Sequence, residues 1–148
     1  MQFMNQPTSV RFGIVGLGNM GNAHAKNILD GKVPGLKLTA IADTNPEKAK
    51  NFPYRDKMEL HLIGHLQSNK ARKAVKLFDV IQTIDSIKLA ERINAICAEM
   101  GTKQRIFIQV NTGNDPAKQG FTINNVMDAI REISKMKQLI IGHITFSV

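Results

Sequence analysis

The sequence predicts an α/β protein with a doubly wound, mostly parallel six-stranded sheet that carries helices on both faces. Short apolar runs rich in β-branched residues alternate with stretches whose apolar residues recur every three or four positions. This alternation is typical of repeated β-α units with parallel strands. A glycine-rich turn follows the first apolar run. The length of 148 residues suits one domain, which we expect over 1–148.

Six strands and four longer helices are predicted in chain order, after a flexible N-terminus at residues 1–9. The apolar, β-branched runs that predict strands are 10–15, 36–42, 60–63, 80–84, 106–110 and 139–146. The stretches with helical periodicity are 20–29, 66–78, 87–100 and 123–136. Pro53 arrives too soon after Asp43 for a full helix to follow the second strand, so a short or broken helix is expected there.

Two of these helices carry clear apolar stripes and end signals. Ser86 and Thr122 are placed to cap the third and fourth helices, and Gly101 lies where the third should end. The stripes predict helix faces that pack into the core. The third helix contributes Leu89, Ala90, Ile93, Ile96, Cys97 and Met100. The fourth contributes Ile123, Val126, Met127, Ile130 and Ile133.

The composition excludes several classes of protein. Hydrophobic residues make up 43% of the chain and charged residues 22%, which argues against disordered, fibrous and membrane-spanning proteins. The single cysteine, Cys97, cannot form an internal disulfide, and the polar start is not that of a secretory signal, so a cytoplasmic location is expected. The net charge of +8 attracts polyanions only non-specifically, so no specific nucleic-acid partner and no membrane are expected.

The glycine-rich turn is the candidate cofactor site. Gly16-Leu17-Gly18-Asn19-Met20-Gly21 forms G-x-G-x-x-G between a strand and a helix, the context in which glycines let a pyrophosphate approach a helix start. Asp43 ends the second strand, about twenty residues beyond the last glycine, where a carboxylate can bind ribose hydroxyls. The predicted cofactor-binding residues are therefore Gly16, Gly18, Asn19, Met20, Gly21 and Asp43. The acid favours NAD over NADP. The alternative is that the glycines only shape the turn and Asp43 only caps a helix.

Two resemblances cover different parts of the chain. The segments GIVGLGNMGNAHAKNIL and LTAIADTNPEKAKNF, within residues 10–52, resemble the start of the glucose-fructose oxidoreductase and inositol dehydrogenase family. That resemblance implies a Rossmann domain that binds NAD(P), a Glu-Lys-Pro motif whose lysine assists hydride transfer, and a large substrate domain. The sequence contains no Glu-Lys-Pro.

From Tyr54 onward the chain resembles the pyridoxal-phosphate homeostasis proteins, which have an alanine-racemase-like barrel. The residues that carry this resemblance are LHLIGHLQSNK at 60–70, Ile84-Asp85-Ser86, Gln109-Val110-Asn111 and Lys118-Gln119-Gly120-Phe121. The resemblance implies a Schiff-base lysine on the first strand and a phosphate site near the last two strands. The first strand here, VRFGIVG, has no lysine, so pyridoxal phosphate is not expected as a cofactor. Lys70 and Lys118 match family lysines in loops, where an amine lacks the desolvation that activates it.

Together these features predict an engineered or recombined chimera of a Rossmann-derived half at 10–52 and a barrel-derived half at 53–148. Because the lysines that do the chemistry in both families are missing, we expect no catalytic activity and no catalytic residues, with weak NAD binding at most. The alternative function is an NAD-dependent oxidoreductase-like or pyridoxal-phosphate-binding protein. The alternative fold is an open, partial TIM-type barrel whose exposed concave face would favour a dimer, so a monomer or a homodimer is expected.

No metal site is predicted. The histidines are His24, His61, His65 and His143, and no cysteine or carboxylate cluster accompanies them at ligand spacing. The most basic stretch, which contains Lys70, Arg72, Lys73 and Lys76, is expected to be a solvated helix face.

Overall fold

The computed structural model describes residues 9–43, 45, 48, 50–53, 58–113 and 115–147 of the chain. The chain divides into two compact units, Met1–Leu60 and His61–Val148. The single domain expected over 1–148 stays a prediction, and so does the junction expected between a half at 10–52 and a half at 53–148. Residues 1–8 of the predicted flexible N-terminus lie outside the described residues.

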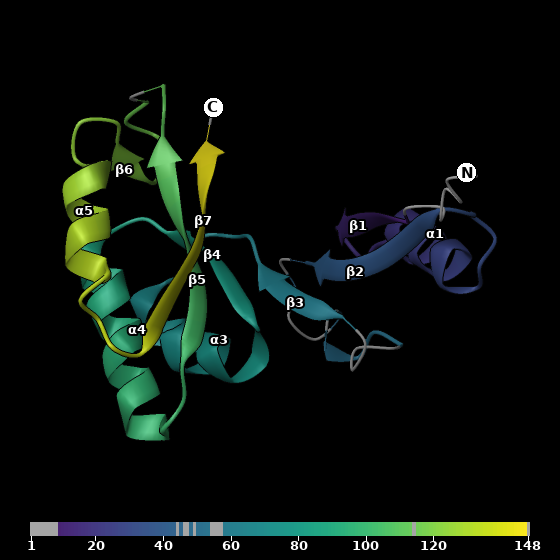
Figure 1. The fold of residues 1–148 in the computed structure, drawn as a ribbon, viewed down its shortest axis with the longest axis horizontal. Coiled ribbons are helices and arrows are strands. Elements are labelled where there is room, and N and C mark those ends of the chain that lie inside the picture. The colour runs from purple at the N-terminus through teal and green to yellow at the C-terminus, as the bar shows by residue number, and fades with distance from the viewer. Residues whose placement is uncertain are drawn as a thin grey trace, which may run out of the picture. The chain divides into compact units, whose positions relative to one another are not determined.

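The first unit contains two parallel strands and one helix. Strand β1 (Val10–Val15) leads through the glycine-rich turn into α1 (Asn19–Leu29), and β2 (Leu36–Ala42) follows (Figure 1). The two strands pair from Val10 opposite Leu36 to Val15 opposite Ala42, with a register shift after Phe12. Helix α1 buries Ala25 and Ile28. In β1 only Ile14 is buried, so most of this apolar strand is exposed.

The second unit repeats β-α connections along parallel strands. Strand β3 (Glu59–Leu62) begins two residues before the unit boundary. The elements that follow it are the 3-10 turn η2 (Ser68–Lys70), α3 (Ala71–Leu77), β4 (Val80–Ile84), α4 (Ile87–Met100), β5 (Gln104–Asn111), β6 (Phe121–Thr122), α5 (Val126–Ile133) and β7 (Leu139–Ser147). All the pairings among these strands are parallel: β3 with β4, β4 with β5, and β5 with both the short β6 and β7. Among the described helices, none combines the length and apolar character needed to cross a membrane.

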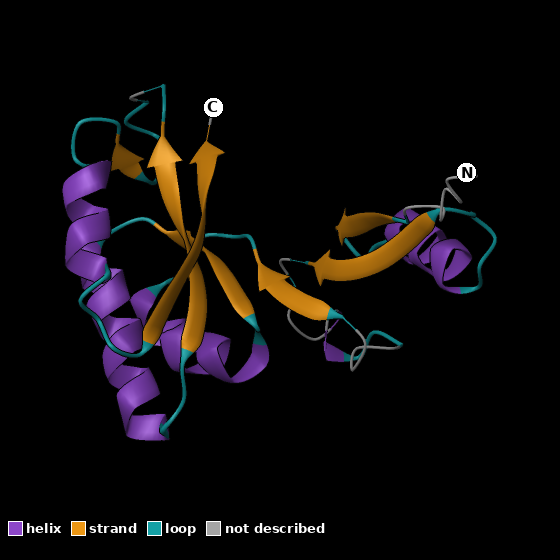
Figure 2. Cartoon of the chain, in the orientation of Figure 1, coloured by secondary structure: helices purple, strands orange, loops and turns teal. Residues whose placement is uncertain are grey.

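The helices of the second unit lie on one face of its strands. Helix α4 packs against β4, β5 and β7 and has α3 and α5 as neighbours, and Figure 2 shows the three helices gathered on the same side. A doubly wound sheet needs a point where the strand order reverses, because that reversal sends later helices to the other face. Strands β3, β4, β5 and β7 instead follow one another in chain order. The predicted sandwich with helices on both faces is therefore wrong for this unit, and its arrangement suits the alternative of a partial barrel.

The side chains of β5 point alternately to the face of the strands that the helices cover and to the opposite face. Ile106 and Ile108 are fully buried on the face that the helices cover. Phe107 points the opposite way, where its ring meets the imidazoles of His61 and His143 edge-to-face, at centroid distances of 6.0 and 5.0 Å. The core of this unit thus lies between its strands and its helices, whereas its other face carries polar and aromatic side chains.

Candidate functional site

The glycine-rich turn of the first unit has the backbone that its sequence predicts. Gly16 has a φ of +89°, which favours glycine. A Cβ on Gly21 would lie 1.8 Å from the carbonyl oxygen of Gly16, so only glycine lets helix and turn pack so closely, whereas a Cβ on Gly18 would meet nothing within 4 Å. Asn19 and Met20 are exposed at the start of α1. The turn borders a mostly apolar cavity of about 910 Å³, which is also lined by His24.

Asp43 serves the backbone of this turn. Its Oδ2 accepts a hydrogen bond of 2.6 Å from the Leu17 N–H, and its Oδ1 accepts one of 2.7 Å from the Asn45 N–H. Burial acts to raise the pKa of Asp43, but these hydrogen bonds, with Lys48 nearby, outweigh burial and hold the pKa below its usual value. The carboxylate therefore ties the glycine-rich turn to the end of β2.

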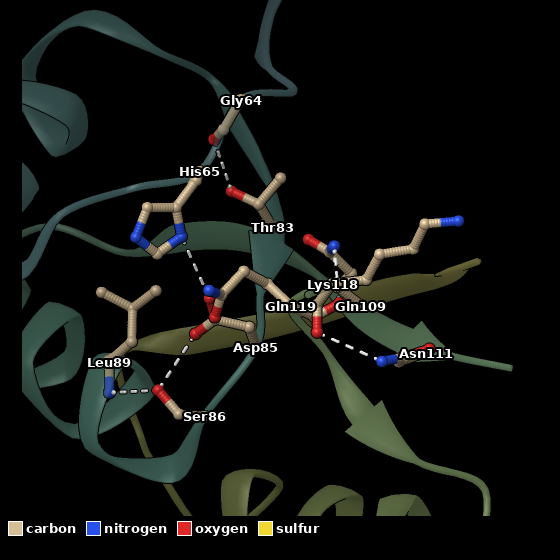
Figure 3. A network of polar contacts seen from close by, with 10 residues as sticks. All are labelled: Gly64, His65, Thr83, Asp85, Ser86, Leu89, Gln109, Asn111, Lys118 and Gln119. Atoms are coloured by element: carbon tan, nitrogen blue, oxygen red, sulfur yellow. Dashed lines mark hydrogen bonds and ion pairs between the residues drawn. The ribbon is translucent and has the colours of Figure 1, made fainter. Parts of the chain in front are cut away.

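A second set of polar side chains lies where β3 and β4 end (Figure 3). The Nδ1 of His65 lies 3.3 Å from Oδ2 of Asp85, and the Ser86 hydroxyl donates to Oδ1 of the same carboxylate at 3.0 Å. Ser86 also caps α4 by accepting a hydrogen bond of 3.4 Å from the Leu89 N–H. The side chain of Asp85 is 9% exposed and that of His65 is 54% exposed. Asp85 therefore orients an imidazole whose other face is open to solvent.

The loop between β5 and β6 forms the opposite wall. The Asn111 amide donates to the carbonyl oxygens of Asp115 and Lys118 at 2.8 and 3.1 Å, and the Gln109 amide donates to that of Gln119 at 3.1 Å. These bonds hold the loop backbone in place from the end of β5. The Lys118 ammonium lies 3.9 Å from Asp115 and points away from His65 in Figure 3.

These two walls enclose a cavity of about 290 Å³, near the lower end of the range for small-molecule sites. It is lined by polar groups of several kinds, namely the side chains of His65, Gln67, Ser68, Asp85, Ser86 and Gln119. Imidazole, hydroxyl and amide groups can together donate and accept hydrogen bonds to a polar ligand. The carboxyl ends of parallel strands are also the usual location of ligand sites in α/β proteins.

The structure brings together some of the predicted residues. Gly16, Gly18, Asn19, Met20 and Gly21 line one cavity, whereas both carboxylate oxygens of Asp43 are engaged by backbone N–H groups. Binding of a ligand by these six residues stays a prediction. Within the described residues, no cluster of three metal-ligating side chains occurs. The pair of His65 and Asp85 was not predicted, although Asp85 directly follows β4 and His65 comes three residues after the end of β3, positions that could have drawn attention to them.

The comparisons with known proteins agree with one of the two resemblances. Residues 39–146 match the protein family described as the alanine racemase N-terminal domain. The pyridoxal phosphate homeostasis proteins of Pasteurella multocida and Vibrio alginolyticus are 33% and 35% identical over 90 and 91 residues, which are 61% and 62% of this chain. The chain spans 37% and 39% of the length of these two relatives.

Solved structures extend the similarity to the fold. The PipY protein of Synechococcus elongatus, in a structure without pyridoxal phosphate, is 26% identical, with a TM-score of 0.73 that covers 95% of this chain and 64% of PipY. An alanine racemase of Clostridium difficile gives a TM-score of 0.71 at 15% identity and shows the fold alone; the match covers 93% of this chain and 36% of the racemase. The fold is therefore α/β with parallel strands of the alanine-racemase-like barrel type, not a Rossmann fold.

These comparisons correct the predicted cofactor. NAD was expected as a weak ligand and pyridoxal phosphate as none, but the relatives are named for pyridoxal phosphate, and PipY has also been solved with it bound. The prediction of NAD, and with it of a dinucleotide partner, is wrong. The comparisons give no support to the oxidoreductase resemblance or to a chimera, since PipY matches most of the chain with a single fold.

Proposed function

Because the chain belongs to the family of the alanine racemase N-terminal domain, we propose that it binds pyridoxal phosphate and acts in the handling of that cofactor rather than as an enzyme. The names of the relatives support the ligand. The chain spans less than half of the length of those relatives. The activity of a complete homeostasis protein is therefore proposed for this chain.

The observation that carries this proposal is the polar cavity at the ends of β3 and β4. Pyridoxal phosphate combines a ring bearing a hydroxyl and an aldehyde with a phosphate, and it supplies electrophilic chemistry when bound. Donors around the cavity suit its oxygen atoms: the His65 imidazole, the Ser68 hydroxyl and the Gln119 amide. The start of α4 beside Ser86 adds the positive end of a helix dipole.

The role of His65 follows from its contact with Asp85. The carboxylate at Nδ1 orients the ring and leaves Nε2 to form a hydrogen bond to a ligand. A hydrogen bond to a charged phosphate or phenolate oxygen is stronger than one between two neutral groups. His65 is thus the side chain whose removal should weaken binding most.

Equilibrium dialysis with pyridoxal phosphate tests the proposal. Loss of one hydrogen bond to a charged group costs about 1.5–3 kcal/mol, so His65→Ala should raise the dissociation constant roughly 10-fold or more. His24→Ala is the matched control, because His24 is also exposed but lines the cavity beside the glycine-rich turn. We expect it to bind like the unchanged protein.

Each other result has a clear meaning. Weaker binding by His24→Ala alone would move the site to the glycine-rich turn, as the sequence predicts for residues 16–21. No retention of pyridoxal phosphate by the unchanged chain would refute the proposed function. Parallel dialysis of pyridoxal and of inorganic phosphate would show whether the ring or the phosphate supplies most of the affinity.

A further inference from the structure

We propose that Asn111 is a positioning residue, which holds the loop between β5 and β6 so that the Gln119 amide meets the ligand. This proposal rests on the proposed function. The described residues of the loop that line the cavity at the ends of β3 and β4 are Lys118, Gln119 and Gly120. Asn111, at the last position of β5, is not among the described residues that line it. Its effect on a ligand must therefore pass through the loop backbone.

The side-chain amide of Asn111 bonds to the loop on both its donor and its acceptor side. The amide nitrogen donates to the carbonyl oxygens of Asp115 and Lys118 at 2.8 and 3.1 Å, and Oδ1 accepts from the Asp115 N–H at 3.3 Å. Asn111 is only 6% exposed, so water cannot readily replace these partners. A loop that moved away would leave a buried amide unpaired, which is costly.

The bond to the Lys118 carbonyl carries this restraint to Gln119. That carbonyl belongs to the planar peptide group that joins Lys118 to Gln119, so fixing its oxygen also fixes the backbone nitrogen of Gln119. The Gln109 amide donates to the next carbonyl, that of Gln119, at 3.1 Å (Figure 3). The peptide groups on both sides of Gln119 are thus held from the end of β5, and its side chain starts from a fixed backbone.

Gln104 provides a matched control on the same strand. It is 3% exposed, and its amide donates to the carbonyl oxygens of Phe78, Asp79 and Arg105 at 3.2, 3.0 and 3.2 Å. Gln104 begins β5 and Asn111 ends it, which separates them by roughly 23 Å at the usual rise of a strand. Loss of the Gln104 amide should therefore destabilise the protein in a similar way without moving the loop.

Equilibrium dialysis with pyridoxal phosphate tests the proposal, at a temperature at which circular dichroism shows every variant to be folded. Asn111→Ala should raise the dissociation constant roughly 3- to 10-fold, the effect of about one neutral hydrogen bond. Asn111→Asp keeps the size and the acceptor but loses both donated bonds, so it should weaken binding by a similar factor. Gln104→Ala should bind within about twofold of the unchanged chain.

A double-mutant cycle with Gln119→Ala tests the route of the effect. Because Asn111 acts through Gln119, adding Asn111→Ala to Gln119→Ala should change the dissociation constant less than about twofold. A full additive effect of the two substitutions would overturn the proposed route.

Cleavage by trypsin after Lys118 measures the loop without any ligand. We expect faster cleavage there in Asn111→Ala than in Gln104→Ala, because exposed loops are cut more readily when they are loosened. Equal cleavage in these two variants would overturn the proposal.

The remaining outcomes separate this proposal from the proposed function. Unchanged affinity in Asn111→Ala or Asn111→Asp, or an equal loss in Gln104→Ala, would overturn the role of Asn111 and leave pyridoxal phosphate binding intact. No binding by the unchanged chain would refute the proposed function, and Asn111 would then have no ligand contact to position.

Discussion

At the scale of single residues, Asp43 shows what a motif predicts and what it does not. Its spacing along the sequence from the glycine-rich turn identifies it as a candidate, and the structure places it beside that turn. The partner was not predictable, because the Leu17 N–H reaches Asp43 only after β1 and β2 have paired. A carboxylate placed to receive ribose hydroxyls and one placed to receive backbone N–H groups have the same sequence signature.

Replacement of Asp43 by asparagine should destabilise the first unit. An amide oxygen can accept only one of the two N–H groups, and the amide nitrogen faces the other, so the loss should be about 1–3 kcal/mol. Since the pKa of Asp43 is lowered by folding, its stabilisation is complete above the unfolded pKa of about 4 and is lost as the pH falls through the lower, folded pKa. Urea unfolding of both proteins across this acid range should show the difference shrinking. A constant difference would contradict this account of the carboxylate.

At the scale of elements, local patterns predict α4 fully and α5 in part. Helix α4 runs over the predicted Ile87–Met100, with the Ser86 cap at its start and Gly101 in the left-handed region at its end. Helix α5 is shorter than predicted and begins at Val126. Ile123 and Met127, both predicted in the core, are 57% and 56% exposed. An apolar stripe shows which side a helix buries, but how far the neighbouring strands extend beneath it depends on the tertiary fold.

The caps of these two helices should differ in strength. The Ser86 hydroxyl accepts from the Leu89 N–H, whereas Asn125 before α5 makes no such side-chain bond. Ser86→Ala should therefore cost about 0.5–2 kcal/mol, and Asn125→Ala should stay within about 0.5 kcal/mol of the unchanged protein. Thermal unfolding followed by circular dichroism measures both. Equal losses in the two variants would show that the Ser86 hydroxyl contributes nothing as a cap.

At the scale of the whole molecule, the sequence predicts parallel β-α units but not the side on which helices lie. Alternating apolar runs and helical stripes are common to doubly wound sheets and barrels. The two differ in whether the strand order reverses, a non-local property with no signature inside any one unit. Within the candidate site, His65, Asp85 and Ser86 were all recognised as part of a family pattern, but the contact of Asp85 with His65 arises only when β3 and β4 lie side by side.

Protection of the backbone amides from hydrogen exchange should also differ along the chain. Five of the six residues of β1 are exposed, whereas β5 has a neighbouring strand on each side and buries every second residue. Opening of β1 thus exposes less new apolar surface, so its amides should exchange with deuterium faster than those of β5. Hydrogen-exchange mass spectrometry of peptides covering the two strands tests this difference. Similar protection in both would show that the chain opens only as a whole.

The chain-order arrangement of β3, β4, β5 and β7 also bears on how the second unit folds. Each strand joins the strand that precedes it in this series, so each pairing closes a loop no longer than one connecting segment. The entropy lost on closing a loop grows with its length. Assembly can therefore advance from either end by addition of one β-α repeat at a time, without waiting for distant parts of the polypeptide to meet.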